Sequence, residues 1–121
     1  MSHTKVVKEK MSEGDRLFSA FYLEVENASL VLLSEGEDRL GTLAVAIPQT
    51  QKMVGPPLSS ILLGDRNVVT ARLIAERLAR ELNKIALASV FIKSISEREA
   101  GPILVRLLEK TVSKEEGNRT S

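Results

Sequence analysis

The sequence predicts an α+β domain, with about six strands in a mainly antiparallel sheet and two helices on one face of that sheet. Three or four apolar runs with turn residues between them precede the first helical segment. Two segments, at about 66–82 and 101–113, have apolar residues at the three- and four-residue spacing of a core-facing helix. Two helices of about 10 Å diameter cover one face of a six-stranded sheet, so the other face stays bare.

The first half of the chain is predicted to be strands joined by short turns. Residues 1–14 are mostly polar and form either a tail or an edge strand. The strand Arg16–Val25 ends at Glu26–Asn27, a tight turn, because Asn tolerates the left-handed conformation that hairpins need. Together with the runs Leu30–Leu33 and Leu40–Ile47, this strand is predicted to form an antiparallel meander.

A glycine turn precedes the first helix. After a short strand at Leu58–Leu63, Gly64 and Asp65 supply the turn, and we predict a positive φ at Gly64. Either Asp65 or Asn67 is predicted to cap the helix by accepting a hydrogen bond from a free backbone amide of its first turn. Asn83–Lys84 suits the C-terminal end of the helix, and the strand Ile85–Lys93 follows.

The start of the second helix is less clear from the residues. Ser96 followed by Glu99 resembles a capping box, but Gly101–Pro102 would interrupt a helix that began there. We therefore predict a loose turn at 96–100 and a helix from about Gly101 to Ser113. Residues 114–121 are charged and polar and are predicted to be a disordered tail, so one domain spans residues 15–113.

Composition argues against several classes of function. The 17 Lys and Arg residues are balanced by 16 acidic ones, so the basic surface of a nucleic-acid binder is missing. The chain has no cysteine, and its single histidine, His3, lies in a polar segment, so we predict no cofactor, no metal site and no catalytic residue. No apolar run approaches the ~18 residues of a membrane span, and a cytoplasmic location is expected.

The bare face of the sheet is predicted to be an interface. Water on one face would require a polar residue at every second strand position, yet the runs at 30–33, 43–47 and 85–92 are apolar at both parities. A chain of this size has no further element to cover that face, so a partner is expected to do so, in helix, sheet, sheet, helix layers. The residues assigned to the interface or the core are Leu30, Val31, Leu32, Leu33 and Val45.

The turn and the first helix resemble a known family. The run Leu62–Asp65, the helix ending Arg77–Arg80 and the following Asn83–Lys84 are similar to the same segments of proteasome assembly chaperone 4 and its archaeal relatives. The close match covers roughly a third of the chain, and beyond it the length and order of elements agree. The resemblance implies a non-enzymatic protein that works in pairs, as a homodimer or with a paralogue, and escorts proteasome α subunits during ring formation.

Two function classes therefore compete, an assembly chaperone and a dimeric scaffold or regulator of the roadblock or profilin-like kind. An enzyme is the weakest alternative, because the carboxylates Glu35, Glu37 and Asp38 lie in a polar loop without an apolar surround. For a chaperone we predict that the loop between two proline positions contacts the client, since Met53 adapts to irregular surfaces and its neighbours offer hydrogen-bonding groups. The predicted contact residues are Gln49, Thr50, Gln51, Lys52 and Met53.

Overall fold

A computed structural model describes residues 4–49 and 57–120, with side chains described for residues 4–49 and 57–113. This part of the chain forms six strands and two helices. In order they are β1 (Lys5–Glu13), β2 (Arg16–Glu24), β3 (Ala28–Glu35), β4 (Thr42–Ile47), β5 (Leu58–Leu63), α1 (Val68–Leu82), β6 (Ile85–Phe91) and α2 (Glu97–Thr120).

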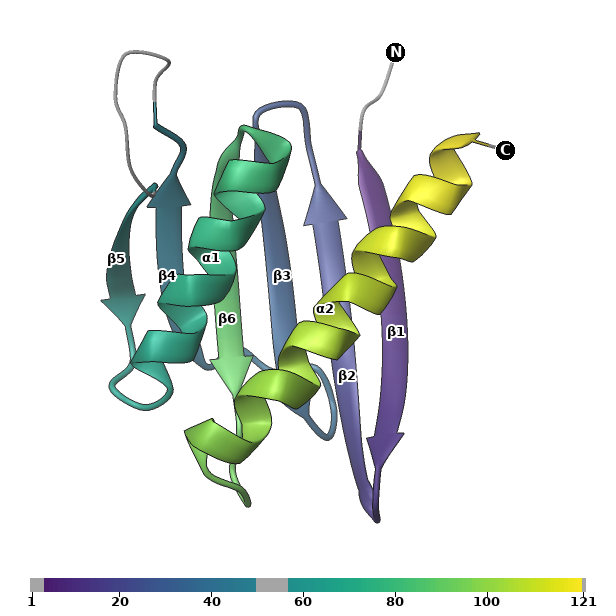
Figure 1. Cartoon of the computed structure of the whole chain (residues 1–121), viewed down its shortest axis with the longest axis vertical. Coiled ribbons are helices and arrows are strands. Elements are labelled where there is room, and N and C mark those ends of the chain that lie inside the picture. Colours follow the sequence, from purple (N-terminus) through teal and green to yellow (C-terminus); the bar gives the residue numbers. More distant parts are fainter. Residues whose placement is uncertain (1–3, 50–56, 121) are drawn as a thin grey trace.

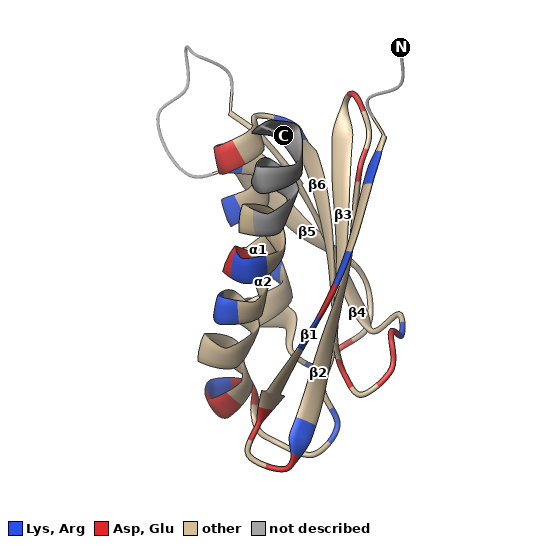
Figure 2. Cartoon of the chain, turned by 90° about the vertical axis from the view of Figure 1, so that its right-hand side faces the viewer, with Lys and Arg blue, Asp and Glu red and all other residues tan. Residues whose placement is uncertain are grey.

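The strands form one sheet in the order β1-β2-β3-β6-β4-β5. Only the β3–β6 pair in this sheet is parallel, and the other neighbours are antiparallel. Both helices lie on the same face of the sheet, and the opposite face carries neither (Figures 1 and 2). The predicted α+β class, the strand number and the placing of the helices are confirmed. Of the two alternatives for residues 1–14, the structure has the edge strand, β1.

The predicted meander of the first three apolar runs is wrong. β2 and β3 do form an antiparallel hairpin, but β6 lies between β3 and β4. β6 is apolar at both parities, which suits a central strand with a neighbour on each side. The predicted meander instead paired the strands in the order in which they follow one another in the sequence. The loop after β3 therefore carries the chain past one strand position, which β6 fills later.

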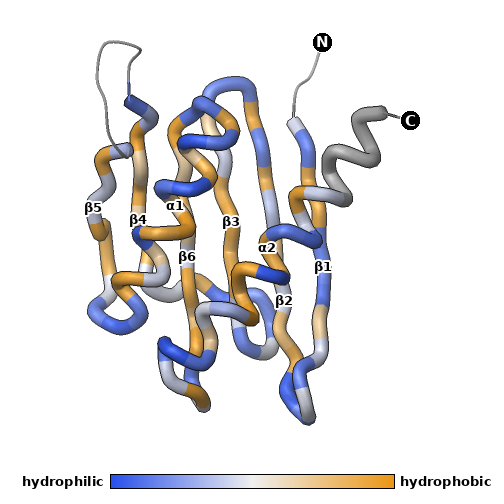
Figure 3. The backbone as a smooth tube through the Cα atoms, viewed as in Figure 1, coloured by the Kyte–Doolittle hydropathy of each residue, from blue (hydrophilic) through white to orange (hydrophobic). Residues whose placement is uncertain are grey.

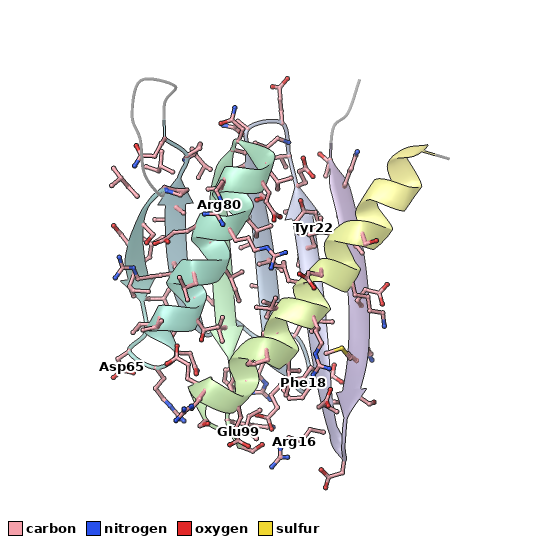
Figure 4. The ribbon with its side chains drawn as sticks, in the orientation of Figure 1. Arg16, Phe18, Tyr22, Asp65, Arg80 and Glu99 are labelled. Atoms are coloured by element: carbon pink, nitrogen blue, oxygen red, sulfur yellow. The ribbon has the colours of Figure 1, made fainter. Side chains whose placement is uncertain are left out.

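The core lies between the sheet and the helices. Small side chains dominate under α1, where Ala71, Ala75 and Ala79 are buried over the strands β4 and β6. Those strands also present alanines, at positions 44, 46, 86 and 88, so α1 can pack close to the sheet. Larger side chains fill the space under α2, where Phe18 and Tyr22 of β2 are fully buried (Figure 4).

The helix α2 begins earlier and ends later than predicted. The Ser96–Glu99 capping box is present, with the Glu99 amide donating to Ser96 Oγ at 3.1 Å, and α2 begins at Glu97. Pro102 lies inside its second turn. A proline there removes one backbone bond, to the carbonyl of Arg98, and the helix continues because its apolar face packs on the sheet. The helix runs through residues 114–120, where the sequence predicts a disordered tail.

The predicted cap of α1 is also replaced. Asn67 is the N-cap residue, with a left-handed backbone at φ 62°, but its side chain makes no capping hydrogen bond. The acceptor comes from the other helix, since the Thr70 amide donates to Glu97 Oε2 at 2.7 Å. At the far end of α1, Asn83 has the left-handed C-cap conformation, at φ 55°, as its residue type predicts.

Candidate interaction surface

The open face of the sheet is built from the strand residues that point away from the helices. Val31 and Leu33 of β3 have no exposed surface and face the helices, so Leu30 and Leu32 point to the other side. Cross-strand register extends this face, because Phe21 is opposite Leu32 and Leu23 is opposite Leu30. Across β6 the same face contains Leu87, Leu43 and Val45.

These side chains form one apolar patch in the middle of the sheet, which we call the open-face patch. Its members are half-buried, since each is covered only by its neighbours in the sheet. They are Phe21, Leu23, Leu30, Leu32, Leu43, Val45 and Leu87. Figure 3 shows the hydrophobic colour running along much of the central strands, while most of the turns are hydrophilic.

Charge is almost absent from this part of the sheet. Among the 27 residues of β3, β4, β5 and β6 the only charged one is Glu35, at the end of β3, and Figure 2 shows these strands nearly free of charged residues. At the β5 edge the patch continues into Leu58, which is 64% exposed. At the β1 edge it meets Val6, 54% exposed, and Lys8, whose ammonium lies 5.9 Å from the centre of the Phe21 ring. A face of this composition is suited to burial against another apolar surface.

The residues predicted for the interface or the core divide between the two faces. Leu30, Leu32 and Val45 belong to the open-face patch, whereas Val31 and Leu33 lie in the core. Sequence reasoning missed Phe21, Leu23 and Leu87, which are cross-strand neighbours of those residues, and Leu43, which lies two positions before Val45 on β4. Their parity was visible in the sequence, but the strand order that brings them together was not.

Most of the loop that was predicted to contact the client lies outside the described residues. Gln49 is described and is half-buried. Thr50, Gln51, Lys52 and Met53 lie outside the described residues.

The Gly64–Asp65 turn has a structural basis. Gly64 has φ 94°, as predicted, and a Cβ added there would lie 2.7 Å from the Cα of Thr42. Only glycine therefore fits the turn, for both conformational and steric reasons. Asp65 is exposed at the end of the sheet, beside the start of α1 (Figure 4).

A buried ion pair ties the other end of α1 to the sheet. Glu24 of β2 is 2% exposed, and its carboxylate pairs with Lys84, directly after α1. The Tyr22 hydroxyl donates to Glu24 Oε1 at 2.9 Å, and Lys84 Nζ also donates to the carbonyl of Val25 at 2.9 Å. The Asn83–Lys84 pair thus ends the helix and anchors the start of β6.

A second buried carboxylate holds the loop between β6 and α2. It is Glu35, which was predicted to lie in a polar loop but is the last residue of β3 and only 6% exposed. Glu35 Oε1 accepts hydrogen bonds from the backbone amides of Lys93, at 3.0 Å, and Ser94, at 2.9 Å. Burial alone would raise the pKa of Glu35, but these bonds, the Ser94 hydroxyl and the charge of Arg16 together lower it. The carboxylate is therefore a structural anchor in its charged form.

The described residues include no group of three or more His, Cys, Asp or Glu side chains placed to hold a metal ion. Within the same residues, no helix is long and apolar enough to span a membrane.

The fold matches that of a solved chaperone. A chain in the crystal structure of a novel chaperone complex for yeast 20S proteasome assembly superposes with a TM-score of 0.68. The match covers 94% of this chain and 96% of that chain, at 13% sequence identity. At this identity the likeness establishes a shared fold. No protein-family profile and no curated protein matches the sequence.

Proposed function

We propose that this chain is a proteasome assembly chaperone, a non-enzymatic protein that binds α-type proteasome subunits and assists formation of the α ring. The observation that carries the proposal is the end-to-end fold match with a chain of a yeast 20S proteasome assembly chaperone complex. The match covers 94% of this chain and 96% of the other, so the likeness extends over nearly the whole fold and is not confined to one motif.

The turn residues that resemble proteasome assembly chaperone 4 support the same assignment. Gly64 and the Asn83–Lys84 pair occupy positions that the fold constrains, at the two ends of α1. A family resemblance concentrated at such positions is consistent with common descent of the fold.

The open-face patch supports pairing as part of this function. A second chain placed against it would bury the apolar centre of the sheet and give the helix, sheet, sheet, helix order. The partner is a second copy of this chain or a paralogue. Sedimentation velocity of the purified protein at micromolar concentration distinguishes the two cases, because a homodimer sediments as a dimer, whereas a chain that pairs only with a paralogue sediments as a monomer.

The client contact is proposed at residues 49–53. Replacing this segment by a Gly-Ser run of equal length is expected to leave folding and pairing intact while weakening the capture of the α subunit.

Native mass spectrometry tests the proposal directly. The purified protein is mixed with single proteasome α subunits from the same organism, and with a proteasome β subunit as the matched control. A complex with one or more α subunits and none with the β subunit supports the proposal. Failure to bind any α subunit, by a protein shown by circular dichroism to be folded, contradicts it.

A further inference from the structure

A groove of about 630 Å³ runs between α1 and α2, on the side of the molecule opposite the open-face patch. Both helices start at the same end of the sheet and diverge along it (Figure 1). From α1 the groove is lined by one helical stripe that includes Thr70, Leu73, Arg77 and Arg80. Its volume is within the range of sites that hold ligands or side chains of a partner.

The walls of the groove are aliphatic and open. Leu73 is 59% exposed, although it is a large apolar residue, and Val105 and Pro102 stand across from it on α2. Gly101 lies beside them, and a Cβ added there would meet nothing within 4 Å. The absence of a side chain at Gly101 therefore leaves free space that an incoming side chain can occupy.

The charged residues of the groove all have one sign. Arg77, Arg80 and Arg106 line it, and none of its lining residues is acidic. Arg77 bonds to Glu109 at 2.9 Å and Arg106 to Glu13 at 2.9 Å, but these are exposed pairs of the kind that contribute little and exchange readily. Arg80, near the C-terminal end of α1 (Figure 4), takes part in no ion pair with a side chain of residues 4–49 or 57–113.

Two links between the helices flank the apolar part. Near the start of α1, Glu97 accepts the hydrogen bond from the Thr70 amide, and two helical turns later Arg77 bonds to Glu109. The Thr70–Glu97 bond is the part-buried one of the two, and it holds the start of α1 against the start of α2, so this end of the groove is formed before a partner arrives. A preformed groove lowers the cost of ordering on binding.

We propose that this groove binds an acidic segment of a protein partner. A large apolar side chain of the segment sits between Leu73 and Val105, and a neighbouring carboxylate pairs with Arg80. A peptide suits the site better than a nucleic acid, because the lining contains no aromatic side chain on which a base could stack. The inference goes beyond the proposed function and stands on the groove alone, whichever subunit the chaperone escorts.

Fluorescence anisotropy with the full chain and a labelled twelve-residue peptide of Glu, Leu and Ser tests the proposal. The same peptide with Lys in place of Glu is the charge control. Saturable binding of the acidic peptide, weakened at least about fivefold by Arg80→Glu and by Leu73→Ser, is expected. Filling the groove with Gly101→Leu should weaken binding as strongly, whereas Gly101→Ala should change it little.

Matched variants on the same helix separate this effect from a general loss of structure. Val69 is as exposed as Leu73, at 59%, and Arg72 is also exposed on α1, but neither lines the groove. Val69→Ser and Arg72→Glu should therefore leave peptide affinity unchanged.

Three outcomes of the peptide-binding experiment overturn the proposal. They are no saturable binding up to millimolar peptide, equal binding of the Lys peptide, and equal losses in the Val69 and Leu73 variants. If Leu73→Ser and Arg80→Glu instead dissociate a dimer of this chain in sedimentation, the groove is occupied by a second copy, and the proposal of a separate partner is wrong.

Discussion

The Thr70 amide at the start of α1 donates a 2.7 Å hydrogen bond to Glu97 Oε2 at the start of α2. One carboxylate thus lies at the N-terminal ends of two helices, where the partial positive charge of each backbone favours it. The N-cap residue of α1, Asn67, provides no side-chain bond, so Glu97, 27 residues beyond Thr70, provides the cap. This bond also links the two helices across the base of the groove.

Removing this carboxylate should destabilise the fold by more than an ordinary surface change. We expect Glu97→Ala to lower the free energy of unfolding by about 1–2 kcal/mol, because the Thr70 amide, on a buried residue, loses a charged acceptor. Urea unfolding followed by circular dichroism measures the change. Asp65→Ala is the control, since Asp65 is one of the two caps that the sequence predicted, and it should cost less. Equal losses for the two variants would show that Glu97 does not serve as the cap.

Gly64 should tolerate no side chain. Gly64→Val places a β-branched residue at φ 94° and a Cβ against the Thr42 backbone, so we expect a loss of about 2 kcal/mol or more. Gly14→Val separates backbone strain from steric clash. Gly14 also has a positive φ, 64°, but a Cβ there meets nothing within 4 Å. The thermal midpoint should fall further for Gly64→Val, and equal midpoints would remove the steric argument.

The sequence predicted the elements better than their arrangement. The helical periodicity of α1, and for Leu58–Leu63 the flanking prolines and the Gly64–Asp65 turn, determined the type and nearly the bounds of these elements, because such signals are local. The position of β6 between β3 and β4 depends on pairings between distant segments, and apolar residues at both parities show that a strand is central without showing which strands flank it. α2 begins earlier than predicted because the capping box at Ser96 starts the helix and the cost of Pro102 in its second turn does not prevent this.

For the candidate site too, the local features could be predicted from the sequence and the long-range arrangement could not. That Leu32 and Leu33 face opposite ways follows from the sequence, but which of the two faces the partner depends on where the helices lie. The groove between α1 and α2 could not be predicted, because it requires the relative position of Leu73 and Val105 on helices from different parts of the chain. Similarly, nothing local to Glu24 indicates that Lys84 is its counter-charge.

Glu35 should make stability depend on acid pH. Its pKa is lowered in the folded protein from an ordinary value of 4.5, because its hydrogen bonds from Lys93 and Ser94 outweigh the opposing effect of burial. Its contribution is therefore fully present above about pH 4.5 and is lost as the pH falls through the lower folded value. Urea unfolding of the wild type and Glu35→Gln across this range should show a difference that shrinks toward acid pH. A difference that is constant with pH would mean that the charge of Glu35 is not what stabilises the loop.

Adjacent leucines on β3 should give opposite phenotypes. Leu32 belongs to the open-face patch, so Leu32→Asp should dissociate the proposed pair while leaving the monomer folded. Leu33 has no exposed surface, so Leu33→Asp buries a carboxylate in the core and should abolish folding. Sedimentation velocity at micromolar concentration reads out association, and far-ultraviolet circular dichroism reads out folding.

Val69→Asp is the control for the Leu32 variant. It adds the same charge at an exposed apolar position of α1, on the other side of the molecule, and should leave association intact. If the partner is a paralogue, the same comparison applies to the mixture of the two chains, because the charge at Leu32 should prevent their complex while the charge at Val69 should not. A Leu32→Asp protein that associates as strongly as the wild type in both assays would place the pairing surface elsewhere than the open-face patch.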